Sequence, residues 1–95
     1  MSFIQIVEYE TDRQAEMEAD MRANMPEPGQ EPWTRLEVTE DRDHPGRYEM
    51  IVEFPSYEVA MENSHDPRTQ EMAKRMASMC NAGPTYRNLN VMRQM

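Results

Sequence analysis

The pattern of apolar and polar positions predicts a first β-strand that begins at Phe3 and ends at Tyr9. Aromatic and β-branched side chains dominate this stretch, as is typical of strands. Successive side chains of a strand point to opposite faces, so Ile4 and Ile6 share one face, while Phe3, Val7 and Tyr9 share the other. Because both faces are apolar, we expect this strand to be covered on both sides and to lie at the centre of a sheet.

Three later stretches also predict strands. Apolar and polar residues alternate from Thr34 to Glu40 and again from Arg47 to Phe54. The polar segment 41–46 between them contains Asp-His-Pro-Gly, a turn signal that places His44 at a loop tip. The two strands therefore form a hairpin. A last strand, with fewer apolar residues, is predicted from Thr85 to Arg93.

A first helix is predicted between the first strand and the hairpin. Thr11 and Gln14 have the spacing of a capping box, with threonine at the N-cap and glutamine three residues on. The helix stops before a loop, residues 26–32, that holds three prolines and a glycine. Methionines recur on this helix at i+4 spacing, at Met17, Met21 and Met25.

Two more helix starts follow the hairpin. Ser56 is placed to cap a short helix that reaches about Asn63. Asp66 and Pro67 then have the N-cap and first-turn positions of a longer helix. Glycine and proline at positions 83–84 are expected to end it. The apolar stripe of this longer helix consists of Met72, Met76, Met79 and Cys80.

The element order β-α-β-β-α-β predicts the fold class. With right-handed crossovers this order gives the α+β, ferredoxin-like arrangement, an antiparallel sheet with its helices on one face. The 95 residues fit one domain, residues 1–95, with no internal repeat. Since the helices leave one apolar face of the sheet bare, we expect a second copy of the chain to cover it, forming a homodimer.

Composition narrows the range of partners. Eighteen acidic and ten basic residues give a net charge of -8, which repels phosphate backbones and anionic lipid. We therefore expect no nucleic acid and no membrane as partners. The single cysteine, Cys80, cannot form an internal disulfide, and the first residues lack the pattern of a signal peptide. Together these features predict a cytoplasmic protein.

The segment Phe54-Pro55-Ser56-Tyr57-Glu58-Val59-Ala60, followed by Asn63-Ser64, resembles the dimeric α/β-barrel proteins. The antibiotic biosynthesis monooxygenase-like branch is the most similar. The resemblance implies that two ferredoxin-like chains pack sheet on sheet, and that each ligand pocket lies between a sheet and its own helices. Members include cofactor-free oxygenases of phenolic compounds, heme-degrading enzymes, lactone isomerases and proteins without an assigned activity, so the fold alone does not determine the function.

Whether the chain fits the heme-degrading branch can be tested with the sequence motif of that branch. Those members carry a tryptophan just before the Asn-Ser pair and a histidine about two helical turns after it. This chain has Met61 at the tryptophan position, and Glu71 and Met72 in the region of the histidine. Of the pattern, Asn63 alone is retained. We therefore expect neither heme nor any other cofactor.

His65 has two interpretations. As a base with a near-neutral pKa at the mouth of a pocket, it would accept a proton from a phenol. As a solvated residue between two helices, it would have no chemical role, and the absence of a second histidine or a cysteine nearby favours this simpler interpretation. In the catalytic interpretation Asn63 and Tyr57 join His65 in positioning the substrate.

The methionines and aromatic residues have similar alternatives. Thioethers bind copper, but the spacing of the two methionine stripes is that of any helix facing a core, so we expect no metal. The same stripes would line a cavity that adapts to apolar ligands. The residues expected to line such a ligand pocket are Trp33, Met61, Met72, Met76 and Tyr86, with Tyr48 and Tyr57 as further aromatic candidates.

Charged residues on the predicted strands give a weaker signal. Glu37, Glu49 and Glu53 lie among arginines, and we interpret them as cross-strand ion pairs on the sheet rather than as catalytic carboxylates. Two functions remain. One is a cofactor-free oxygenase or isomerase acting on a small aromatic or quinone-like compound. The other is a non-catalytic dimeric module that binds a small apolar ligand.

Overall fold

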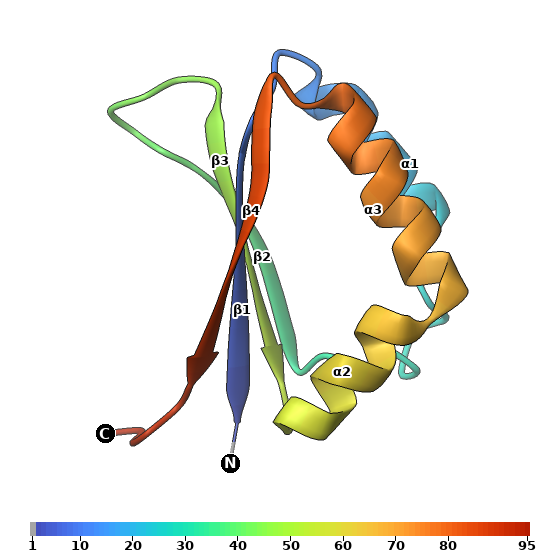
Figure 1. Ribbon diagram of the computed structural model, residues 1–95, viewed down its shortest axis with the longest axis vertical. Coiled ribbons are helices and arrows are strands. Elements are labelled where there is room, and N and C mark those ends of the chain that lie inside the picture. The colour runs from blue at the N-terminus through green and yellow to red at the C-terminus, as the bar shows by residue number, and fades with distance from the viewer. Residues whose placement is uncertain (1) are drawn as a thin grey trace.

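The computed structural model describes residues 2–95, which form one antiparallel sheet with three helices on one side (Figure 1). In chain order the elements are β1 (Phe3–Glu10), α1 (Gln14–Ala23), β2 (Arg35–Glu40), β3 (Arg47–Phe54), α2 (Tyr57–His65), α3 (Pro67–Met79) and β4 (Ala82–Asn90). The strand order across the sheet is β2-β3-β1-β4. This is the ferredoxin-like arrangement, and β1 lies at the centre, as its pattern predicted.

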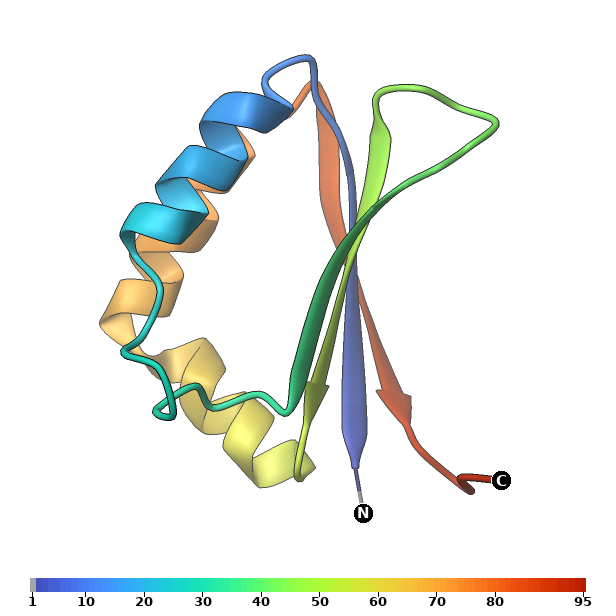
Figure 2. The ribbon, with the colours of Figure 1, turned by 180° about the vertical axis from the view of Figure 1, so that it is seen from behind.

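The two apolar sets of β1 face opposite ways. Phe3, Val7 and Tyr9 are buried beneath the helices. Ile4 and Ile6 lie on the other face, which no element within residues 2–95 covers (Figures 1 and 2). The uncovered face also carries the predicted cross-strand ion pairs. Arg35 Nε lies 3.8 Å from Glu53 and Arg87 lies 3.5 Å from Glu49.

The buried residues divide into two clusters under different helices. Phe3, Val52, Phe54 and Ala60 pack together where α2 crosses the sheet. Val7, Tyr9, Met17 and Met76 pack together under α1 and α3. Apolar burial of this kind contributes roughly 1.5–3 kcal/mol for each fully buried large side chain. The two clusters hold the helical layer to the sheet at both ends.

The helix starts after the hairpin are confirmed. Ser56 is the N-cap of α2, and its Oγ accepts a hydrogen bond from Val59 N at 3.2 Å. Asp66 is the N-cap of α3, where its Oδ1 accepts from Arg68 N at 2.9 Å, and Pro67 is the first residue of the helix. These caps satisfy amide groups that have no partner within the helix.

The capping box predicted at Thr11 is wrong. Helix α1 begins only at Gln14, and the buried Thr11 hydroxyl donates to Met79 O at 2.6 Å while accepting from Arg13 N at 2.9 Å. The side chain of Gln14 accepts from the Tyr9 hydroxyl instead of reaching back to Thr11. Thr11 therefore ties the start of α1 to the end of α3, because tertiary contacts compete for the groups that would form a local cap.

The end predicted for the last helix is also wrong. Helix α3 ends at Met79, and positions 83–84 lie inside β4. Gly83 has φ +81° at an irregularity in the β1–β4 register between Glu8 and Glu10. The glycine is required there because a Cβ would lie 2.8 Å from Glu8 O. None of the helices within residues 2–95 has both the length and the apolar character that a bilayer span requires.

Candidate functional site

A cavity of about 560 Å³ lies between the sheet and the helical layer. Its floor is the helix-facing side of the sheet, including Val7, Met50 and Val52, and its roof comes from α1 and α3. The loop between α1 and β2, residues 24–34, closes one end. Six methionines line it: Met17, Met21, Met25, Met50, Met72 and Met76. The methionine stripes therefore face a cavity as well as a core.

Five of the residues predicted for a site line this cavity: Trp33, Asn63, Met72, Met76 and Tyr86. Trp33 enters from the end of the α1–β2 loop and packs against the cluster around Phe54. Tyr86 enters from β4, opposite Val7 of β1. Tyr86 is 49% exposed, and its partial burial raises the pKa of its hydroxyl, which is protonated at physiological pH.

The other three predicted residues lie outside the cavity lining. Met61 packs against the core cluster around Phe3. Tyr57 is 52% exposed and makes an edge-to-face contact with Phe3, with ring centroids 5.4 Å apart. His65 is the exposed last residue of α2, directly before the N-cap of α3. Tyr48, a further aromatic candidate, stacks on Tyr9 instead.

The phase of helix α2 explains this division. Val59, Glu62, Asn63 and Asp66 line the cavity at i, i+3, i+4 and i+7 spacing. Residues two positions from Asn63 are rotated by roughly 200° about the helix axis, given 3.6 residues per turn. Met61 and His65 are two such residues. They consequently point away from the face of the helix that meets the cavity.

Asn63 is held by a hydrogen bond from the next helix. The Thr69 hydroxyl of α3 donates to Asn63 Oδ1 at 3.1 Å, and both residues line the cavity. With its carbonyl oxygen engaged, the amide has its N–H₂ group available as a donor. Within residues 2–95, no acceptor is bonded to that group. The site thus presents a positioned hydrogen-bond donor next to an apolar volume.

Sequence reasoning missed several polar residues of the lining, namely Asp20, Asn24, Glu62, Arg68 and Thr69. A signal was present for some of them. Asp20 and Asn24 follow Met17 by three and seven positions, which is the spacing of one helix face. Asp20 is also paired with Arg75 of α3, with an Nε–Oδ1 distance of 2.9 Å, and this pair links the two helices above the cavity.

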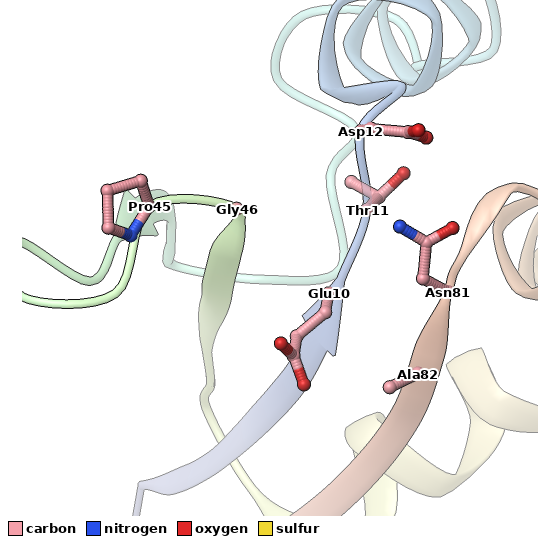
Figure 3. Close-up of a pocket in the computed structure, with 7 residues that line it drawn as sticks. All are labelled: Glu10, Thr11, Asp12, Pro45, Gly46, Asn81 and Ala82. Atoms are coloured by element: carbon pink, nitrogen blue, oxygen red, sulfur yellow. The ribbon is translucent and has the colours of Figure 1, made fainter.

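A second, smaller hollow of about 280 Å³ opens at the other end of the sheet (Figure 3). It lies among the end of β1, the β2–β3 loop and the start of β4, and is lined by Glu10, Thr11, Asp12, Pro45, Gly46, Asn81 and Ala82. Thr11 is already engaged by backbone groups there. Across residues 2–95, no group of three His, Cys, Asp or Glu side chains is arranged to hold a metal ion. The larger cavity is therefore the candidate site.

The fold and this cavity define a ferredoxin-like protein with a ligand-sized space between its sheet and helices. No protein-family model matches the chain, and the comparison with curated proteins found no match. Solved structures do match it. A variant of SnoaB, a cofactor-independent oxygenase from Streptomyces nogalater, is 11% identical with a TM-score of 0.80, over 99% of this chain and 96% of that one.

Two further structures extend this comparison. An antibiotic biosynthesis monooxygenase is 14% identical with a TM-score of 0.74, over 96% of this chain and 99% of its own. A dimeric ferredoxin-like protein of unknown function from Jannaschia sp. CCS1 is 18% identical with a TM-score of 0.73, over 96% of this chain and 100% of that one. Identities this low show the fold alone. The chain has the fold of the antibiotic biosynthesis monooxygenase-like proteins, which confirms the predicted resemblance.

Proposed function

We propose that the protein binds a small apolar aromatic compound in the cavity between its sheet and helices, and that it does so as a homodimer. The observation that carries this proposal is the cavity itself. Its volume of about 560 Å³ lies within the range of roughly 300–1,000 Å³ that small-molecule sites occupy. Methionine side chains adapt their shape to apolar ligands, and Trp33 and Tyr86 add aromatic surface.

Asn63 supplies the polar anchor. A flat apolar compound with a phenol or quinone oxygen would place that oxygen at the amide N–H₂ group, which Thr69 orients. A few positioned polar groups in an apolar wall are the usual means by which a pocket fixes the orientation of its ligand. In the binding role Asn63 therefore matters more than His65, which lies outside the lining.

Self-association is supported by the uncovered face of the sheet. Ile4, Ile6 and Ile51 of the two central strands lie there, and Leu89 of β4 is 41% exposed. A second copy packed on this face would remove these side chains from water. The similar structure from Jannaschia sp. CCS1 is described as dimeric, which supports self-association here.

A second candidate function is a cofactor-free oxygenase or isomerase, which the likeness to SnoaB favours. In such an oxygenase the substrate supplies the electrons: 1-naphthol and O₂ would give 1,4-naphthoquinone and water. Asn63 would orient the phenol oxygen, with His65 and Tyr57 as the other predicted catalytic residues. Because His65 and Tyr57 are exposed and outside the cavity lining, the binding function has the stronger support.

The experiment uses Trp33, the single tryptophan of the chain, as a reporter inside the cavity wall. Titration with 1,4-naphthoquinone should quench its fluorescence saturably at one ligand per chain. Ala73→Leu places extra atoms in the lining and should weaken binding at least about tenfold, because the larger side chain occupies space that the ligand needs. Ala77→Leu is the matched control, because Ala77 is exposed on the same helix and outside the lining.

If Ala73→Leu leaves the saturable quenching unchanged, the ligand does not bind in this cavity. Absence of quenching in the wild type would contradict the proposal as well. Oxygen uptake with 1-naphthol then separates the two functions. Catalysed uptake of one O₂ per naphthol would identify an oxygenase. Binding without uptake by this or related phenols would identify a module without turnover.

A further inference from the structure

The polar part of the cavity lining is biased in charge. Its four carboxylates are those of Asp20, Glu27, Glu62 and Asp66. A single cation, Arg68, lies in the lining, and Arg75 pairs with Asp20 from outside it. Four carboxylates against these two guanidinium groups leave an excess of two negative charges around the cavity.

Three of these carboxylates lie at one end of the cavity, where Arg68, the second residue of α3, also lies. Glu27 comes from the α1–β2 loop, Glu62 from α2, and Asp66 from the joint between α2 and α3. Figures 1 and 2 both show this loop running alongside the α2–α3 joint. Within residues 2–95, the carboxylates of Glu27 and Glu62 have no side-chain hydrogen bond or ion pair. The chain therefore leaves them available to a ligand.

The apolar wall at the same end of the cavity also favours a positively charged ligand. Trp33 ends the loop that carries Glu27, and it lines the cavity together with Met25 and Met72. The face of an indole ring attracts cations more strongly than that of any other side chain. Thioethers are polarisable and pack well against aromatic and apolar groups. A site with acidic groups beside an indole suits an ammonium group attached to an apolar body.

We propose that the natural ligand is an arylalkylamine, or another flat apolar body that carries a cationic group at neutral pH. Its flat body would occupy the methionine-lined volume, and its ammonium group would lie between Glu27 and Glu62. This inference rests on the proposed function, whose cavity it uses. A ligand of the same shape with a carboxylate would meet the excess negative charge and bind more weakly. The net charge of -8 acts in the same direction at longer range.

The test compares three probes of one shape: 1-naphthylmethylamine, 1-naphthylmethanol and 1-naphthoate. Calorimetric titration of the full chain near neutral pH should give a Kd for the amine at least about fivefold lower than for the carboxylate, as expected for partly exposed charges. The difference should shrink in 0.5 M salt, where such charges are screened. The neutral alcohol should fall between the two.

The variant Glu62→Gln tests whether the preference for the amine depends on this carboxylate. It should weaken binding of the amine about two- to fivefold and leave the alcohol unchanged, since only the charge is removed. Glu58→Gln is the matched control: it lies on the same helix, is exposed and outside the lining, and changes the net charge equally.

Each outcome decides a separate claim. Equal or tighter binding of 1-naphthoate would overturn the preference for a cation while leaving the cavity as a binding site. An equal loss in Glu58→Gln and Glu62→Gln would show that overall charge acts, not this site, and would also overturn the inference. Failure of all three probes to bind, the neutral alcohol included, would remove the proposed function and the inference together.

Discussion

The Thr69 hydroxyl donates a hydrogen bond to Asn63 Oδ1 across 3.1 Å, joining α3 to α2 at the edge of the cavity. The sequence singled out Asn63 through its motif, but it gave no sign that Thr69 would bond to it. Together they determine which atoms of the Asn63 amide meet a ligand. In the proposed binding function Thr69 is therefore a positioning residue, whose effect on a ligand would pass through Asn63.

We expect Asn63→Ala and Thr69→Val each to weaken binding of 1,4-naphthoquinone by about three- to tenfold, the usual effect of one lost hydrogen bond. Because Thr69 acts through Asn63, the double variant should bind no more weakly than Asn63→Ala alone. Quenching of Trp33 measures all three. Asn81→Ala, outside the cavity, is the control, and additive losses in the double variant would refute the positioning role.

The uncovered sheet face gives a second prediction. Ile6 lies opposite Ile51 in the two central strands, so Ile6→Glu would place a charge at the middle of the proposed dimer contact. Light scattering at micromolar concentration should give twice the chain mass of 11.2 kDa for the wild type and a single chain mass for Ile6→Glu. Ala15→Glu, on the exposed side of α1, should remain dimeric. A monomeric wild type would defeat the proposal.

Gly83 gives a prediction about stability. Gly83→Ala adds a Cβ 2.8 Å from Glu8 O at φ +81°, so we expect a loss of about 2–4 kcal/mol in the free energy of unfolding. Gly29→Ala is the matched control, since Gly29 has φ +87° but nothing within 4 Å of the added Cβ. It should lose only about 1 kcal/mol. Equal losses in urea unfolding would show that the close approach to Glu8 has no cost of its own.

Tyr9 gives a prediction about pH. Burial raises the pKa of its hydroxyl, which donates to Gln14 Oε1 at 3.0 Å. The folded chain therefore keeps this proton to higher pH than the unfolded chain does. Above about pH 10, where an unfolded tyrosine ionises, the stability should fall with rising pH.

The test is Tyr9→Phe, measured by urea unfolding at pH 7.5 and pH 10.5. At the lower pH the variant should lose about 1 kcal/mol with the hydrogen bond to Gln14. Between the two pH values it should lose less stability than the wild type does. Tyr48 and Tyr86, whose pKa values are also raised, contribute equally to both proteins. An identical fall in both would show that Tyr9 is not linked to folding.

Most of the fold was predictable because its signals are local and periodic. The alternation in β3 gave its bounds, and Ser56 and Asp66 marked the starts of α2 and α3. The errors at Thr11 and Gly83 arose where a local motif was used for a distant contact. Thr11 bonds to Met79, and Gly83 lies against Glu8, partners that no short window of sequence reveals.

The candidate site was predictable to the level of the segment but not of the individual side chain. The resemblance identified the stretch around Asn63, and methionine spacing identified the faces of α1 and α3 that meet the cavity. Which residues of α2 point inward depends on the rotation of that helix against the sheet. Ala60 of this helix is buried in the cluster with Phe54, a tertiary contact, while His65 is exposed.

The alternation of β1 also determines where the chain tolerates inserted residues. One residue added between Gln5 and Ile6 would exchange the two faces for the rest of the strand, sending Val7 and Tyr9 toward solvent and Ile6 beneath the helices. The insertion would therefore disrupt the cavity floor and the proposed dimer surface at the same time. An insertion in loop 24–34 would change neither face of the sheet. Variation in length among natural relatives of this chain should therefore concentrate in that loop and spare β1.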